Sequence, residues 1–463
     1  MTTFFRCTFV LFMAMLCVSC GFSNGSGPIT TNNNFSVVVF SDFHFNPFDD
    51  TTLCPALDAA DVSAWQGIFE GSSKVNTLPA WQSDTNYHLL TVALSGVKQN
   101  LGTSPVIIFT GDLLGHNFPS SFSTDCSNPD PVAMGAFANK TAIFVMQQVR
   151  ASAGNIPVLF VVGNSDSYIG LGPDSTFLAA TVEPYYTNFV NGSAADYPAF
   201  FNTFTSGGYY SAEPLGPNLK VIALNTTSFA PPYPGFPNTD SAVYAELGWL
   251  DATLASAQAA GQKVWLLMHI PPGADTVTSS TNFAKGPLTS TTAAMMWVPA
   301  YQESFLQILA KYPGVITLTL AAHTHRDEFR IMSPNNVLQI TPSISPFFGN
   351  DPAFKVLTFS KNTFAPTDYR SVNYDLATAP AQFNAYYTFS TDYSAQGPLD
   401  NSLTMLYPTL NTDMAKQALY IEHYNSGNNS GNFNPITPAS WPVFACGIGK
   451  MAQQDVIDCV NSY

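Results

Sequence analysis

Charged side chains are scarce in this sequence. Only 10% of the 463 residues are Asp, Glu, Lys or Arg, and 31 acidic residues outnumber 16 basic ones, which gives a formal net charge of -15. A negative field repels phosphate backbones, which argues against a nucleic-acid polymer as a partner. A small anionic substrate would need a local positive centre, and bound metal ions can supply one.

The apolar stretch near the N-terminus is too short to cross a membrane. It covers residues 9–18, about half of the roughly twenty residues that a span needs. With Arg6 before it and small residues after it, it predicts a cleavable export signal over residues 1–20 and no transmembrane span. Cys20 is a candidate site for a lipid anchor, although Cys17 stands where such sites prefer Leu. Simple cleavage and release is the alternative, so we expect a secreted, periplasmic or outer-surface protein.

Cysteine is also sparse, and no CxxC pattern exists, which argues against a cysteine zinc site. Beyond residue 20 the cysteines are Cys54, Cys126, Cys446 and Cys459. An even number in an exported chain predicts disulfides, with Cys446–Cys459 as the first pair and Cys54–Cys126 as the remaining one. Glycosylation sequons, which do not settle whether the chain is a glycoprotein, occur at Asn34, Asn139, Asn191, Asn225 and Asn428.

Hydrophobic residues are abundant, at 46% of the sequence, and many of them lie in short apolar runs. Five runs rich in Val, Ile, Leu or Phe lack polar alternation, as strands buried on both faces do: 35–40, 105–110, 157–162, 263–268 and 315–322. A sixth candidate strand covers 219–224. Helix-like segments lie between several of the runs: 87–100, 134–151, 247–260 and 301–312. This alternation predicts an α/β layered fold.

The remaining segments define the expected domain organisation. Residues 173–201 and 230–240 are rich in Pro, Gly and aromatics, which predicts long loops around a substrate. After about residue 365 the sequence pattern changes to scattered aromatics and helix-like pieces. We therefore expect a catalytic domain over 33–365 and a smaller, mainly helical C-terminal subdomain over 366–463.

Each of the five apolar runs ends in candidate metal ligands: Asp42 and His44, Asp112, Asn164, His269, and His323 and His325. Ligands in α/β sheets bind beyond the carboxyl ends of strands, so these groups should meet at one rim. Imidazole, carboxylate and amide oxygen favour zinc, manganese or iron. The i,i+2 spacing within the Asp and His pairs predicts that each pair shares one face of extended chain. Asp112, on a central strand, is the natural bridge between two metals.

Two metals about 3.5–4 Å apart can clamp a phosphate oxygen and generate hydroxide. A single buried histidine is more often a core residue than a ligand. The complete set is a stronger signal, because four of the seven histidines stand at strand ends and His116 follows Asp112 by four residues. The residues predicted to act in catalysis are His116, Asp112 and Asn164.

These motifs together resemble the calcineurin-like metallophosphoesterase superfamily. Further segments are similar to its acid sphingomyelinase-like phosphodiesterase branch: Gly111-Asp112-x-x-x-His116, 207–211 (GGYYS), 224–226 (LNT), 323–327 (HTHRD), 341–346 (TPSISP) and the terminal Cys446/Cys459 segment. The resemblance runs from about residue 36 to the end. Purple acid phosphatases match less well, because their tyrosine ligand corresponds to Gly115 here.

The resemblance implies a β-sandwich flanked by helices and two divalent metals, usually zinc. One metal would take Asp42, His44, Asp112 and His325, and the other Asp112, Asn164, His269 and His323. The family pattern also departs at one position, because Ser165 replaces a histidine that assists the leaving group. Three explanations compete: His116 carries the acid role alone, the leaving group needs little help, or the enzyme is weakened. General acid assistance is typically worth about 10²–10⁴-fold.

The expected reaction is hydrolysis of a phosphodiester or pyrophosphate by a metal-bridging hydroxide, with a nucleotide or phosphocholine-type substrate. Lipid substrates are less favoured. The acid sphingomyelinases that this chain resembles carry a lipid-binding saposin domain before the catalytic domain, and here only about fifteen residues separate the predicted signal from the first expected strand. The alternatives are a phosphomonoesterase or nucleotidase, and a non-catalytic surface binding protein that retains its metals. We expect ordinary structural roles for His88, His423, Tyr209, Tyr210, Phe347 and Phe348, whereas Arg326 could pair with an acid or touch substrate.

Overall fold

The computed structural model of this chain describes Met1 and residues 33–190, 195–232, 240–333, 336–428 and 433–463. The predicted export signal, Cys20 and the sequon at Asn191 lie outside the described residues. Of the other sequons, Asn225 and Asn428 are buried, which leaves no space for a glycan there. Within the described part of the chain, none of the helices combines the length and the apolar character that a membrane crossing requires.

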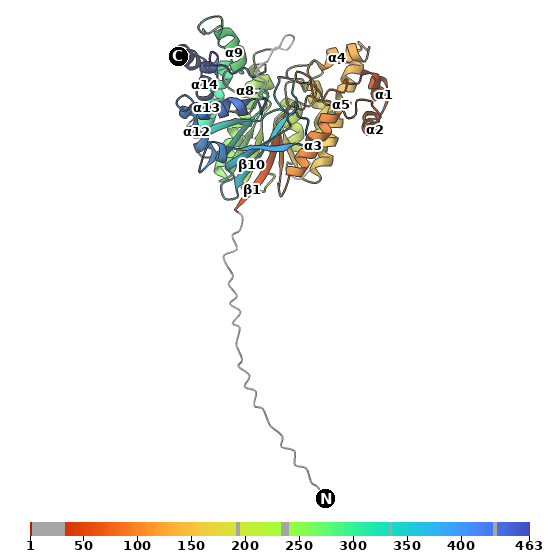
Figure 1. Cartoon of the computed structure of the whole chain (residues 1–463), viewed down its shortest axis with the longest axis horizontal. Coiled ribbons are helices and arrows are strands. Elements are labelled where there is room, and N and C mark those ends of the chain that lie inside the picture. Colours follow the sequence, from red (N-terminus) through yellow and green to blue (C-terminus); the bar gives the residue numbers. More distant parts are fainter. Residues whose placement is uncertain (2–32, 191–194, 233–239, 334–335, 429–432) are drawn as a thin grey trace. The chain divides into compact units, whose positions relative to one another are not determined.

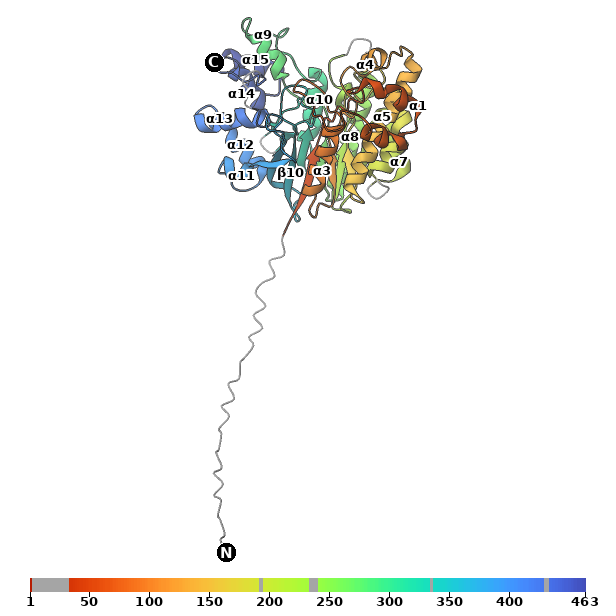
Figure 2. The same cartoon turned by 45° about the vertical axis from the view of Figure 1, so that its right-hand side comes forward.

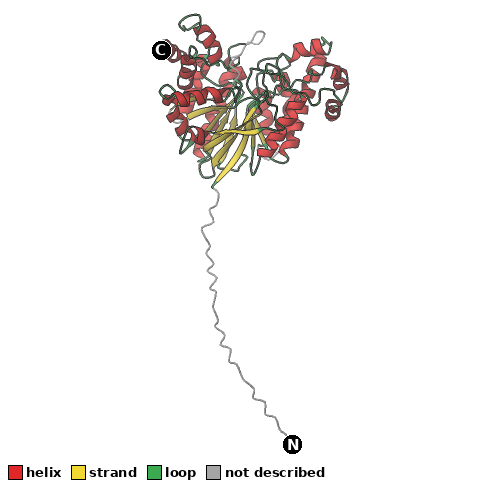
Figure 3. Ribbon diagram, viewed as in Figure 1, coloured by secondary structure: helices red, strands yellow, loops and turns green. Residues whose placement is uncertain are grey.

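Two six-stranded sheets form the centre of the fold (Figure 3). The first has the order β12 (Asn384–Thr388), β11 (Pro366–Asn373), β10 (Ala353–Ser360), β1 (Asn34–Phe40), β2 (Ile107–Phe109) and β3 (Val158–Phe160). Strands β1, β2 and β3 are parallel, and the other neighbours pair antiparallel. The carboxyl ends of the three parallel strands therefore lie at one edge.

The second sheet also contains a parallel core. Its order is β4 (Tyr210–Ala212), β5 (Leu219–Ala223), β6 (Lys263–Leu267), β7 (Ile316–Ala321), β9 (Asn336–Ile340) and β8 (Glu328–Ser333). Strands β5, β6, β7 and β9 are parallel, whereas β4 and β8 pair antiparallel at the edges. All six strands expected from the sequence are present, each within two residues of its predicted ends.

The two sheets face each other through alternate residues of their strands. In β6, the indole of Trp265 packs on Phe35 of β1 and Phe359 of β10, with ring centroids 6.3 and 4.6 Å away. Its neighbours Val264 and Leu266 point the other way, into a cluster with helices α8 (Asp240–Ala259) and α10 (Pro299–Ala310). Both faces of the strand are thus buried, which explains the lack of polar alternation. The predicted layered α/β fold is confirmed.

Helices cover the outer face of the first sheet as well. Helices α3 (Tyr87–Asn100) and α5 (Pro131–Ala153) lie side by side next to β1–β3 (Figures 1 and 2). Asn86 caps α3 by accepting the Leu89 N–H, and Asp130 caps α5 by accepting the Val132 N–H. Such caps satisfy backbone donors that have no partner inside the helix. Shorter helices surround this pair: α1 (Cys54–Ala59), α2 (Trp65–Glu70) and α4 (Phe118–Asp125).

The prediction of a long loop over 173–201 was wrong. Helix α6 (Ser175–Tyr185), a π-helical turn (Tyr186–Val190) and the start of α7 (Tyr197–Gly207) occupy most of it. Asp174 and Asp196 cap the two helices. The aromatics that suggested a loop rim instead fill the core, since Tyr185 stacks on Phe160 of β3 at 4.2 Å. Helix α8 begins at Asp240, the last residue of the second expected loop, and residues 233–239 of that loop lie outside the described residues.

The C-terminal region is mainly helical after its first strands. It contains α11 (Phe389–Asp392), α12 (Leu399–Thr409), α13 (Met414–Tyr424), α14 (Trp441–Gly449) and α15 (Gln453–Asn461). Helix α14 contacts β8 and α9 (Thr276–Phe283), while β11 and β12 extend the first sheet. The segment after 365 thus shares a sheet with the preceding residues. A subdomain boundary at 365/366 stays a prediction.

Both predicted disulfides are present. Cys54 bonds to Cys126 across 72 residues, and Cys446 of α14 bonds to Cys459 of α15 across 13 residues. Their Cα atoms lie 5.4 and 5.9 Å apart, within the ordinary range for a bridge. The longer one ties the α1 region to the end of α4. A loop of this size removes roughly 4–5 kcal/mol of unfolded-state freedom in the chain-entropy account.

Candidate metal centre

Left-handed turns, and not extended chain, present the candidate ligands. Five of the seven residues have positive φ: Asp42 (51°), His44 (42°), Asp112 (64°), His323 (71°) and His325 (61°). The expectation that each i,i+2 pair shares one face of extended chain was therefore wrong. A residue other than glycine in this region costs about 1–3 kcal/mol and persists only where its surroundings impose it. Such a concentration at the ends of β1, β2 and β7 marks a functional site.

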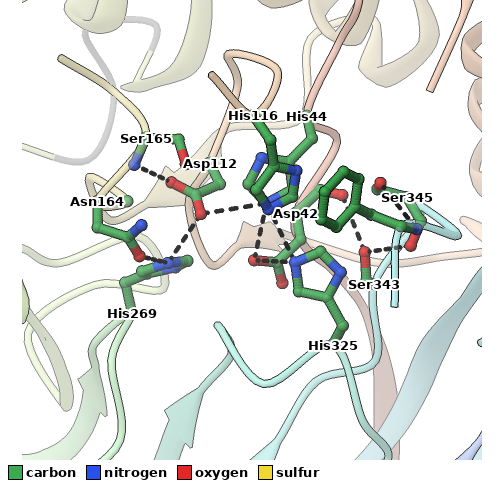
Figure 4. Close-up of polar contacts among 12 residues, drawn as sticks. Asp42, His44, Asp112, His116, Asn164, Ser165, His269, His325, Ser343 and Ser345 are labelled. Carbon is green, nitrogen blue, oxygen red and sulfur yellow. Dashed lines mark hydrogen bonds and ion pairs between the residues drawn. The ribbon is translucent and has the colours of Figure 1, made fainter. Parts of the chain in front are cut away.

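Asp112 lies at the middle of the cluster (Figure 4). Its Oδ2 is 3.2 Å from Nε2 of His44 and 3.1 Å from Nε2 of His269. Its Oδ1 accepts the backbone N–H of Ser165 at 2.7 Å. One carboxylate oxygen thus stands between two imidazoles that come from different sheets.

On one side of Asp112, His44 and His325 approach Asp42. The Nε2 atoms of the two histidines are 3.1 Å apart, and each lies within 3.8 Å of Asp42 Oδ1. His44 directs Nδ1 to the carbonyl of Leu114 at 3.0 Å. That hydrogen bond makes Nδ1 a donor and turns Nε2 inward, where it can bind a cation once its proton is displaced. The Nε2 atoms of His44 and His325 thus lie side by side, and a cation bound between them would interact favourably with both.

On the other side, His269, Asn164 and His323 form a matching group. His269 Nδ1 binds the Thr110 carbonyl at 2.7 Å, and its Nε2 lies 3.0 Å from Asn164 Oδ1. The ring of His323 is 5.2 Å from that of His269. Nitrogen or oxygen atoms of Asp112, His269 and His323 lie within 4.8 Å of one another, as do those of Asp42, His44 and Asp112. The fold thus brings all seven sequence-predicted residues together.

The donor set fits two divalent cations. Both carboxylate oxygens of Asp42 and Nδ1 of His325 are buried and lack a hydrogen-bond partner among the described residues. Leaving a buried charged group without a partner is costly, so such atoms point to a missing counter-charge. Imidazole, carboxylate and amide oxygen are ligands of zinc, manganese and iron. The individual ligand roles stay predictions.

The electrostatics of the cluster support this interpretation. Burial raises the pKa of Asp42 to about 6. Burial alone would lower the pKa of His44, yet the Asp112 carboxylate outweighs it and raises that pKa to about 9, and the same balance raises the pKa of His269 to about 9. In the absence of metal the carboxylates hold protons on their neighbours. Divalent cations can take the place of those protons.

Two glycines allow the strand-end turns to approach each other. A Cβ at Gly163 would lie 2.0 Å from Oδ1 of Asp112, and one at Gly111 would lie 2.7 Å from Nδ1 of His269. Gly111 also has a φ of 101°. Glycine at both positions is therefore a packing requirement of the centre.

His116 lies beside the cluster. Its ring is stacked between His44, at 3.8 Å, and Phe347, at 3.9 Å. Its Nδ1 lies 2.7 Å from Oδ1 of Asp84. Burial and the neighbouring His44 lower its pKa, although Asp84 acts in the opposite direction. Ring nitrogens of His116, His44 and His325 lie within 4.8 Å of one another, and a catalytic role for His116 beside the metal ligands stays a prediction.

A cavity of about 910 Å³ opens over the centre. Candidate ligands form its floor, and its walls include Leu171, Ile270, Val277, Met295, Met296, Phe347, Phe348, Tyr424 and Phe433. Phe348 is 45% exposed and Val277 is 46% exposed, so apolar surface reaches the rim. Arg326 borders the cavity and donates to the Phe348 carbonyl and to Asn425. The cavity can hold a substrate with an apolar or aromatic group.

Two carboxylates outside the predicted site residues also contact the centre or its neighbour His116. Asp166 accepts the N–H groups of Gly163 and Leu113 at 3.0 and 2.8 Å, which ties the turn after β3 to the turn after β2. Its position directly after the Gly163–Ser165 motif was a usable signal. Asp84 precedes α3 and carries no local signal. Of the residues expected to be structural, Tyr210 bonds the Phe160 backbone, whereas Phe347 and Phe348 line the cavity.

Comparisons with known proteins agree with this geometry. A family model described as calcineurin-like phosphoesterase matches residues 35–327. The chain is 25% identical over 312 residues to sphingomyelinase phosphodiesterase C of Dictyostelium discoideum, covering 62% of each protein. It is 26% identical over 305 residues to the human cyclic GMP-AMP phosphodiesterase SMPDL3A, covering 62% of this chain and 58% of that one. The alignments thus span less than two thirds of these relatives.

A solved structure is also similar. A dimetal phosphatase from Danio rerio matches with a TM-score of 0.42 and 12% identity, covering 73% of this chain and 95% of that one.

Proposed function

This chain belongs to the calcineurin-like phosphoesterase family, and from that premise we propose that it hydrolyses phosphodiesters or pyrophosphates at a dimetal centre. Family membership makes it a hydrolase. The observation that carries the proposal is the position of Asp112, whose Oδ2 lies between His44 and His269 at 3.2 and 3.1 Å. That is the position of a bridging ligand.

The proposed ligand assignment follows the two groups of side chains. Asp42, His44 and His325 would hold one ion, Asn164, His269 and His323 the other, and Asp112 both. Two bound divalent ions supply a hydroxide nucleophile and polarise the phosphate oxygens. The mixed imidazole and carboxylate set favours zinc. We assign the bridging role to Oδ2 of Asp112, because Oδ1 already accepts the backbone N–H of Ser165 at 2.7 Å.

We assign His116 to the leaving group. With Nδ1 held by Asp84, Nε2 is the nitrogen that faces the cavity and can deliver a proton to the departing oxygen. Ser165 cannot replace it, because a hydroxyl group does not act as an acid near neutral pH.

The cavity walls support a proposal for the substrate class. The floor is surrounded by Phe347, Phe348, Met295 and Phe433, so the group esterified to phosphorus would carry a nucleobase or another apolar body. One relative is named as a sphingomyelinase phosphodiesterase and another as a cyclic GMP-AMP phosphodiesterase, so both names support a phosphodiester substrate. We favour a soluble nucleotide or phosphocholine-type ester.

We further infer that the protein is exported. The disulfides Cys54–Cys126 and Cys446–Cys459 fit an oxidising compartment. Lipid attachment at Cys20 is a prediction that lies outside the described residues.

The function is tested with purified, metal-loaded protein. We expect chelator-sensitive hydrolysis of bis(p-nitrophenyl) phosphate that exceeds hydrolysis of p-nitrophenyl phosphate. Asp112→Ala and His269→Ala should each lower turnover by more than about 100-fold and reduce the metal content, because loss of a ligand should exceed the 10–100-fold typical for an outer partner. Faster cleavage of the monoester would establish a phosphomonoesterase. Bound metals without hydrolysis between pH 4 and 9 would establish a binding protein.

A further inference from the structure

Asp84 holds His116 at two points. The carboxylate is buried and lies two residues before Asn86, the N-cap of α3. Its Oδ2 accepts the backbone N–H of His116 at 2.7 Å, while its Oδ1 lies 2.7 Å from Nδ1 of the ring. Oδ1 also accepts the Ser345 hydroxyl at 3.1 Å. The residue is therefore bonded to the backbone and the side chain of one histidine.

These contacts fix the orientation of the imidazole. An ionised carboxylate only accepts hydrogen bonds, so Nδ1 must be the donor and Nε2 faces the metal centre. The stacks on His44 and Phe347, with interplanar angles of 19° and 18°, fix the plane of the ring. Asp84 then fixes its rotation within that plane. Ring nitrogens of His116, His44 and His325 lie within 4.8 Å of one another.

In this chain, catalysis should depend strongly on the orientation of His116. The Ser165 hydroxyl is buried, and its oxygen has no hydrogen-bond partner among the described residues. Among the residues that line the cavity, His116 is the one imidazole outside the proposed ligand set. No second imidazole in that lining could compensate for a rotated His116.

We propose that Asp84 is the positioning residue that aims Nε2 of His116 at the leaving group, an inference that rests on the proposed function. Asn at position 84 would offer one acceptor and one donor where His116 presents two donors, so either one contact breaks or the ring changes to the tautomer whose Nδ1 accepts. Both outcomes remove the support for a ring that donates from Nδ1 and directs Nε2 to the leaving group. A cavity of about 240 Å³ lined by Asp84, His116 and Phe347 leaves room for the extra methylene of Glu. Asp84→Glu is therefore the conservative variant.

The kinetic test compares two leaving groups, with the p-nitrophenyl and phenyl esters of thymidine 5′-monophosphate as substrates. Asp84→Asn should lower kcat on the phenyl ester by about 10–100-fold, with KM within about threefold of wild type. On the p-nitrophenyl ester the loss of kcat should stay below about threefold, because p-nitrophenolate departs with little help from a proton donor. Asp84→Glu should recover most of the activity. His116→Gln should show the same pattern, and the double variant should be no worse than His116→Gln.

Asp351→Asn is the matched control. Asp351 is also buried and accepts from Trp81 Nε1 at 3.1 Å and from the Leu376 N–H at 3.2 Å, without a contact to His116. We expect kinetics within about threefold of wild type. Equal losses on both esters for Asp84→Asn, or the leaving-group pattern in Asp351→Asn, would overturn the proposal.

A readout independent of turnover is nitrogen NMR of the metal-free protein with labelled histidine. The wild type should contain one imidazole with a carboxylate-bonded, downfield Nδ1–H proton, which disappears in Asp84→Asn and His116→Gln but persists in Asp351→Asn. An unchanged signal in Asp84→Asn would overturn the positioning role. A different outcome would overturn the proposed function instead: the wild type shows the Asp84-dependent signal but hydrolyses neither ester. Asp84 would then orient His116 without any effect on catalysis.

Discussion

A single methyl group at Gly163 should displace the bridging carboxylate. The backbone at Gly163 does not have a positive φ, so alanine meets no conformational penalty there. Its Cβ would, however, lie 2.0 Å from Oδ1 and 2.3 Å from the backbone nitrogen of Asp112, whereas ordinary contact begins at 3.4 Å. The turns after β2 and β3 must therefore separate by more than about 1 Å.

The magnitude follows from this displacement. A misplacement of about 1 Å in a catalytic group costs on the order of 10²-fold in rate. Overpacking of this kind typically costs about 1–3 kcal/mol of stability. We expect Gly163→Ala to lose about two orders of magnitude in kcat on bis(p-nitrophenyl) phosphate and to bind fewer than two metals per chain.

The assay combines elemental analysis after gel filtration, steady-state kinetics and urea unfolding. The control is Gly248→Ala, which adds the same methyl group at an exposed position of α8 with no atom within 4 Å. It should keep wild-type activity and gain about 0.5–1 kcal/mol, because it removes a helical glycine. Full metal content and activity within about threefold in Gly163→Ala would refute the packing argument.

Further predictions concern His116, Ser165 and His423. His116→Ala should lower kcat by about 10²–10⁴-fold while the metal content stays at two per chain; unchanged turnover would remove its role at the leaving group. Ser165→Ala should stay within about threefold of wild type, because the hydroxyl has no partner among the described residues, and a larger loss would mean that this hydroxyl takes part. Burial lowers the pKa of His423 to about 4, although Asp392 Oδ2 lies 3.3 Å from Nε2. Because the unfolded chain binds this proton near pH 6.5, stability should fall by up to about 3 kcal/mol between pH 6.5 and 4. His423→Phe, which can keep the stack on Tyr387, should flatten that part of the pH profile measured by chemical unfolding, and an unchanged slope would contradict the assignment.

The grouping of the candidate ligands was predictable because its signals are local. Each buried strand is a short uninterrupted apolar run, and the polar residue that ends it lies within a few positions. Parallel strands then bring those ends to a common edge, which is how Asp42, Asp112 and His269 could be grouped although 70 and 157 residues separate them in the sequence. The paired cysteines followed from their even number in a chain with a predicted export signal.

The predictions that failed depended on conformation or on distant packing. Composition made residues 173–201 look like loop, because prolines and aromatics occur in loops as well as in cores. Only the contact of Tyr185 with Phe160 shows which of the two applies. The left-handed conformations of His44 and His323 also have no sequence signature, since they are imposed by the surrounding structure.

The sequence by itself determined which side chains could bind metal and that they end neighbouring strands, since hydrophobic runs and spacing are short-range properties. The tertiary structure alone decided how His116 is aimed. Asp84 stands 32 residues before it and Phe347 more than 200 residues after it, and both contacts exist because packing brings three separate turns together. The cavity walls have the same origin, because Met295, Phe348 and Phe433 come from loops that meet only in the folded chain.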